Sequence, residues 1–138
     1  MTEYFYVSEQ IHEFAVREGI SWLAREAKSS RAGWVAVMES GSIRIFSRYR
    51  GLGILKLLAK PPFQADIFGL NLKLITPQNL PANYENLHVL AIFPSDQFIE
   101  KLLNVAGATK ILVTPWSRND AEYWVGLTGV RLYNRPLG

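Results

Sequence analysis

Three short apolar segments in the second half of the chain each run directly into a proline. They cover residues 72–76, 89–93 and 111–114. Proline has no N–H to donate to a strand ladder, so each proline predicts the end of a strand. Segments that are apolar at consecutive positions indicate strands buried on both faces, which is typical of a parallel sheet covered by helices.

Helical patterns alternate with these strands. Apolar side chains at helical spacing follow Ser95 and again follow Ser117, and serine is a good helix N-cap. A longer pattern after Ser8 predicts one helix, weakened or divided in two at Gly19. Residues 54–60 are strongly apolar and end at two prolines, which predicts a short helix.

The remaining segments are less regular. Residues 34–38 form an apolar run that predicts a further strand. Residues 43–46 fit either a half-buried strand closing a hairpin or the beginning of a helix, and both interpretations stay open. Residues 63–71 are expected to be a loop, and residues 77–86 a turn-rich connection. Residues 130–133 are expected to be a short edge strand.

This order of elements predicts an α/β protein. We expect a three-layer α/β/α sandwich whose mainly parallel sheet has four or five strands, in a Rossmann-like or flavodoxin-like architecture, with room for an antiparallel edge hairpin. The length of 138 residues suits one domain, so residues 1–138 are expected to fold as a single α/β domain.

Composition excludes several classes of chemistry. The chain is 49% hydrophobic and 20% charged, a balance that indicates a folded domain. It contains no cysteine, which excludes disulfides, thiolate metal sites and a cysteine nucleophile. It lacks an apolar run of membrane-spanning length and a basic N-terminal leader, so we expect a cytoplasmic location and no membrane partner. With two histidines and no second Glu-x-x-His copy, we expect no metal site, and no cofactor is indicated.

Positive charge is concentrated in the second quarter of the chain. The net charge is +3 overall, yet residues 31–60 hold six basic residues against Glu39 alone, a local balance of +5. A local patch of one sign can attract a partner of the other sign. This segment therefore favours an anionic partner.

The basic segment also carries the strongest candidate binding motif. Cations that could neutralise phosphate alternate with glycines that let the backbone approach a ligand closely, just before a predicted helix. The motif lacks the third glycine of the dinucleotide fingerprint and the Gly-Lys-Ser/Thr of a P-loop. Ser95 and Ser117 add two helix N-termini at the carboxyl ends of strands, where open parallel sheets bind ligands. The candidate ligand-binding residues are Arg44, Arg48, Arg50, Gly51, Gly53, Lys56, Ser95 and Ser117. The alternative interpretation is a solvated basic turn and serines that only cap their helices.

These observations favour a small binding module over a catalyst. The expected ligand or partner is anionic and phosphate-containing, held by residues 44–60. Alternatives are an enzyme acting on a phosphorylated small molecule, a nucleic-acid-binding protein in which Phe46 or Tyr49 stacks on a base, and a regulatory protein that binds a protein partner. A homo-oligomer could form through edge strands and exposed aromatic side chains, for which Trp116 is the candidate. The alternative interpretation of Trp116 is that it packs over the end of the sheet. No nucleophile elbow is present, and no catalytic residue is assigned.

Overall fold

The computed structural model describes residues 3–6, 11–28, 31–80, 83–103, 106–116, 122–124 and 131–132. Strands and helices are interleaved along these residues. In chain order they are β1 (Glu3–Tyr6), α1 (His12–Glu26), β2 (Ala32–Ala36), α2 (Ser42–Phe46), the 3-10 helix η1 (Gly53–Leu58), β3 (Gln64–Ile67), β4 (Leu70–Ile75), β5 (Asn83–Ile92), α3 (Asp96–Leu103), β6 (Ala106–Thr114) and β7 (Arg131–Leu132).

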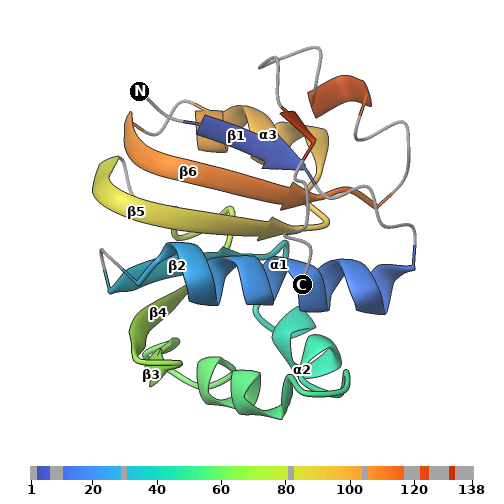
Figure 1. Ribbon diagram of the computed structural model, residues 1–138, viewed down its shortest axis with the longest axis vertical. Helices are drawn as coiled ribbons and strands as arrows, with labels where there is room; N and C mark the ends of the chain where they lie inside the picture. The colour runs from blue at the N-terminus through green and yellow to red at the C-terminus, as the bar shows by residue number, and fades with distance from the viewer. Residues whose placement is uncertain are drawn as a thin grey trace.

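The strands form one sheet in the order β3-β4-β2-β5-β6-β1-β7. Every neighbouring pair is parallel except β3 and β4, which form an antiparallel hairpin at one edge (Figure 1). The mixed α/β class and the mostly parallel sheet are therefore confirmed. The short strands β1 and β3, which the sequence did not indicate, extend the sheet beyond the expected four or five strands.

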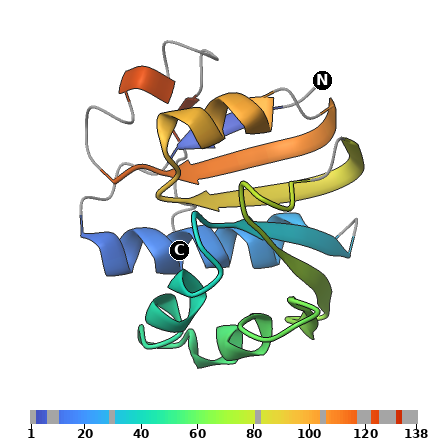
Figure 2. The same cartoon turned by 180° about the vertical axis from the view of Figure 1, so that it is seen from behind.

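The central strands are apolar at consecutive positions because both faces of the sheet are covered. Val35 of β2, Leu90 of β5 and Leu112 of β6 are in register and belong to the core beneath α1. Their neighbours Val89 and Ile111 point to the opposite face, where the core includes α3. The two views show α1 in front of the sheet and α3 behind it (Figures 1 and 2).

Helix α1 is continuous through Gly19, so of the two alternatives the structure shows one helix and not two short ones. Gly19 is buried against the sheet, and a Cβ atom built on it would lie 2.6 Å from Leu90 Cδ1. The glycine therefore allows the helix to approach the sheet closely. The helix begins at His12 with Ile11 as N-cap, while Ser8, the predicted cap, lies outside the described residues.

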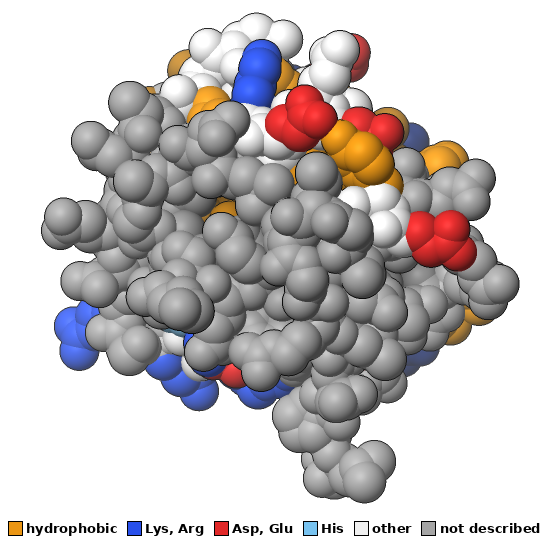
Figure 3. All heavy atoms as spheres, turned by 90° about the horizontal axis from the view of Figure 1, so that it is seen from above, with side chains coloured by type: hydrophobic (Ala, Val, Ile, Leu, Met, Phe, Trp, Pro, Cys, Tyr) orange, Lys and Arg blue, Asp and Glu red, His pale blue; other side chains and the backbone are white. Residues whose placement is uncertain are grey.

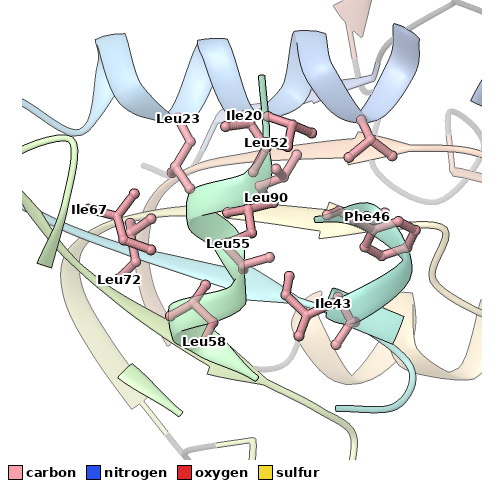
Figure 4. Close-up of a cluster of buried hydrophobic side chains, with 14 of the residues drawn as sticks. Ile20, Leu23, Ile43, Phe46, Leu52, Leu55, Leu58, Ile67, Leu72 and Leu90 are labelled. Atoms are coloured by element: carbon pink, nitrogen blue, oxygen red, sulfur yellow. The ribbon is translucent and has the colours of Figure 1, made fainter. Parts of the chain in front are cut away.

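The connection from β2 to β3 is helical, and its buried side chains face α1. Residues 43–46, whose sequence fitted either a strand or the beginning of a helix, belong to α2. Ile43 and Phe46 from α2, and Leu55 and Leu58 from η1, point into the same core as Ile20 and Leu23 of α1 (Figure 4). The predicted helix over residues 54–60 is a 3-10 helix that ends before the two prolines.

Three expectations about the strands need correction. Residues 63–71 are not a loop, because β3 and the beginning of β4 pair there around a turn in which Phe68 and Gly69 have φ of 57° and 75°. Strand β5 begins at Asn83, inside the expected connection. Strand β1 was not predicted; it pairs with β6 and β7. The edge strand expected near residue 131 is present as β7.

Candidate functional site

A groove along the outer side of α1 collects charged and aromatic side chains from three separate parts of the chain. Its volume is about 710 Å³. Arg17 and Arg25 come from α1, Arg50 comes from the turn after α2, and Phe68 comes from the β3–β4 turn. We call it the arginine groove, and its other lining residues are Phe14, Glu18, Ile20, Ser21, Ala24, Gly51 and Leu52.

Local structure fixes the turn that carries Arg50. Before it, the Ser47 hydroxyl donates a hydrogen bond to the Arg44 carbonyl at 2.7 Å, which closes the end of α2. Gly51 adopts φ of 83°, a left-handed conformation that favours glycine and reverses the chain. Leu52 is then buried in the core beneath α1. Arg50 is thus held between two anchored points and faces the helix.

The charge in the arginine groove is predominantly positive. Arg17, Arg25 and Arg50 stand against one carboxylate, Glu18. The Arg17 guanidinium lies 5.9 Å from the centre of the Phe14 ring, a cation–π distance. Phe14 and Phe68 are both exposed. Chemically, this arrangement offers guanidinium groups to an anion and ring faces to a planar group.

The structure separates the predicted site residues. Arg50 and Gly51 line the arginine groove, whereas Arg44, Arg48 and Lys56 are exposed and are not among its lining residues. Nothing lies within 4 Å of a Cβ built on Gly53, so no close approach explains that glycine.

The two serines do not join the groove either. The Ser95 hydroxyl accepts a hydrogen bond from the Phe98 N–H at 3.2 Å, so Ser95 caps α3 as predicted. Phe98 is part of the core on the opposite face of the sheet from α1. Asp96 already supplies negative charge to the first turn of α3, which disfavours an anion there. Ser117 lies outside the described residues.

A second, smaller hollow lies where β2 and β4 end. It has a volume of about 340 Å³, and its polar lining residues are Glu39, Ser40, Thr76, Gln78 and Asn79. Asn79 Oδ1 accepts hydrogen bonds from the Thr76 N–H at 2.6 Å and from the Thr76 hydroxyl at 3.3 Å. We call it the rim hollow. It shares no lining residue with the arginine groove and is lined by no arginine or lysine.

An aromatic cluster occupies the neighbouring part of the same edge, where β5 and β6 end. The His12 ring lies 3.7 Å from the Trp116 ring and 4.8 Å from the Phe93 ring, measured between centres. Phe93 has φ of 48°, and its N–H donates to both the carbonyl and the hydroxyl oxygen of Thr114, at 3.0 and 3.2 Å. Trp116 is 60% exposed, and its ring also packs against His12 and Phe93 at the sheet end; a subunit contact through it stays a prediction.

Sequence reasoning missed Arg17, Arg25 and Phe68. Arg17, Ser21 and Arg25 are spaced by four residues and therefore lie on one side of a helix, which is a signal that the sequence does contain. Phe68 could not be placed because the hairpin that carries it was not predicted.

Other kinds of site find no support among the described residues. There, no group of three or more histidine, cysteine, aspartate or glutamate side chains could hold a metal ion. Within the same part of the chain, no helix combines the length and the apolar character needed to cross a bilayer. Comparison of the chain with protein-family models, with curated proteins and with solved structures gives no match.

Proposed function

We propose that this protein is a binding module for a small phosphate-containing ligand, held in the arginine groove. One observation carries the proposal: two arginines of α1 and Arg50, 25 residues further along the chain than Arg25, line a single groove together with exposed aromatic rings. Guanidinium groups that come from distant segments and line one groove can contact the same phosphate group together.

The chemistry of the groove suits a nucleotide better than a bare anion. Guanidinium groups match phosphate oxygens in a two-point geometry. Phe14 and Phe68 offer faces on which a base could stack. The volume of about 710 Å³ lies within the range of small-molecule sites, about 300 to 1,000 Å³. Glu18 would accept hydrogen bonds from ligand hydroxyl or amino groups.

An analogy with other three-layer α/β proteins also supports the proposal of a nucleotide ligand. Sheets with helices on both faces, as in Rossmann-like and flavodoxin-like proteins, commonly bind nucleotides. The full strand order differs from the 3-2-1-4-5-6 and 2-1-3-4-5 orders of those folds because of β3 and β1, although the central strands β4-β2-β5-β6, numbered in chain order, read 2-1-3-4. Those folds bind their ligands at the carboxyl ends of the strands, whereas the arginine groove lies along α1. The support for the proposal therefore comes from the residues of the groove and not from its location.

Calorimetric titration with ATP and with inorganic phosphate tests the proposal. Arg50→Ala should weaken ATP binding by about tenfold or more, because it removes a charged hydrogen-bond donor. Arg48→Ala is the matched control, since Arg48 is a neighbouring exposed arginine that does not line the groove. Its effect should stay below about twofold.

Three outcomes would overturn the proposal. They are the absence of saturable ATP binding, an equal loss in the two variants, and stronger binding of single-stranded oligonucleotides that falls steeply with salt, which would indicate a nucleic-acid-binding protein.

A further inference from the structure

The segment between β2 and β3 carries five basic residues, and its one acidic residue, Glu39, lies near its beginning. Residues 40–65 contain five basic residues and no aspartate or glutamate, so their net charge is +5. Arg44 and Arg48 lie in and after α2, and Lys56 and Lys60 lie in and after η1; all four are exposed. Residues 40–65 are therefore cationic along their length, between the exposed acids Glu39 and Asp66.

The same segment exposes large apolar side chains, and the geometry of η1 explains why. A 3-10 helix has three residues per turn, so residues i and i+3 lie on the same side. Leu55 and Leu58 form the side that is buried in the core (Figure 4). Ile54 and Leu57 form a second side, which is exposed, with Leu57 54% accessible. Ile45 of α2 is exposed as well.

The opposite end of the molecule has a different character. Figure 3 views the molecule from the end away from α2, where acidic and basic side chains are both visible among the described residues. On α3, Asp96 and Glu100 are exposed together with Lys101. The combination of apolar side chains with charge of one sign is thus a feature of the α2–η1 segment.

We propose that the outward side of α2 and η1 docks on the surface of an anionic phospholipid bilayer. Exposed apolar side chains can enter the boundary between headgroups and acyl chains, while lysine and arginine stems lie along it and place their charges at lipid phosphates. Membrane attachment usually requires two signals, and an apolar patch together with a basic patch provides them. The sequence lacks a spanning run, but peripheral contact does not require one.

Charge and composition argue against two other occupants. A second copy that met this face with its own would place +5 against +5, which disfavours a symmetric dimer. The centres of protein–protein interfaces are depleted of lysine, whereas here the exposed Lys56 directly precedes the exposed Leu57 in the sequence. A lipid surface accommodates apolar and basic side chains side by side, because its charged headgroups lie directly above its apolar acyl chains.

Co-sedimentation of the full chain with vesicles tests the proposal. One set of vesicles contains phosphatidylcholine alone, and the other also contains phosphatidylserine. The protein should bind the second set at least about tenfold more strongly at low salt, and this preference should shrink as salt is raised. The proposal goes beyond the nucleotide hypothesis, and the residues that its variants change do not line the arginine groove, so either proposal can fail alone.

Two double variants separate the contributions of apolar contact and charge. Ile54→Ser with Leu57→Ser should lower binding to phosphatidylserine vesicles by about tenfold or more. Lys56→Gln with Lys60→Gln should lower it by about twentyfold. Ile11→Ser is the control, because Ile11 is 57% exposed but lies at the start of α1. It should leave vesicle binding unchanged, and circular dichroism melts verify that each variant is folded.

The proposal is overturned by equal binding to the two vesicle types, or by unchanged binding of the folded Ile54→Ser, Leu57→Ser variant. It is also overturned if sedimentation velocity shows a dimer that this variant dissociates, because the apolar side chains would then cover a second copy.

Discussion

Leu55 and Leu57 lie two residues apart in η1. Truncation of Leu55 should lower the stability of the fold strongly, whereas truncation of Leu57 should hardly change it. Leu55 is completely buried in the core beneath α1, while Leu57 is 54% exposed. Leu55→Ala removes buried methyl groups and leaves a cavity that the surrounding side chains of the same buried cluster can fill only in part (Figure 4). Buried leucine-to-alanine changes cost about 2 to 5 kcal/mol, and we expect about 3 kcal/mol here.

The assay is urea or thermal unfolding followed by circular dichroism. For a chain of this length each kcal/mol lowers Tm by about 3 to 4 °C, so Leu55→Ala should lower Tm by about 10 °C. Leu57→Ala should change the free energy of unfolding by less than about 0.5 kcal/mol, as surface substitutions usually do. Equal losses in the two variants, or a larger loss for Leu57→Ala, would refute the assignment of buried and exposed sides to η1.

Two further predictions concern pH and backbone conformation. The pKa of His88 lies below its ordinary value of 6.5, because burial disfavours the charged ring and Lys110 repels it. On acidification His88 therefore takes up a proton more readily in the unfolded chain than in the folded one. The stability that the neutral ring contributes is complete above about pH 6.5 and is lost as the pH falls below it. In urea melts, His88→Phe should reduce the dependence of the unfolding free energy on pH in this range, and an unchanged dependence would contradict the assignment. Gly51→Ala should cost about 1 kcal/mol because of the left-handed backbone at Gly51, whereas Gly53→Ala, which has open space around it, should cost nearly nothing, and equal melting temperatures would count against this.

The apolar runs predicted the central sheet because burial on both faces requires them. Residues 89–92 and 111–113 alternate between the two cores, so every position is apolar and the strands are visible in the sequence. Strand β3 was missed since its sequence, Gln64-Ala65-Asp66-Ile67, contains residues that are uncommon in strands, and its pairing with β4 is a tertiary fact. Strand β1 was missed because four residues hold too little pattern to distinguish a strand from a tail.

The two glycines of the basic segment, Gly51 and Gly53, have different roles that the sequence motif does not predict. Both were predicted to let a backbone approach a ligand, yet they differ in the structure. Gly51 has a conformation that side chains disfavour, and it turns the chain so that Arg50 faces α1. Gly53 begins η1 with open space around it and no left-handed backbone. Spacing in the sequence makes the two glycines look equivalent, and only the backbone angles distinguish them.

The separation of the arginine groove from the strand ends follows from the path of the connection between β2 and β3. Parallel strands bring Glu39, Thr76 and Trp116 to one edge, as the sequence rule expects. After β2, however, the chain stays on the face that α1 covers, because Ile43, Phe46, Leu52 and Leu55 all pack into that core. This packing carries Arg50 to the flank of α1, beside Arg17 and Arg25, while the rim hollow is left without an arginine or a lysine. Arg50 of the basic segment is therefore placed along a helix and not at the strand ends, by apolar residues that carry no charge themselves.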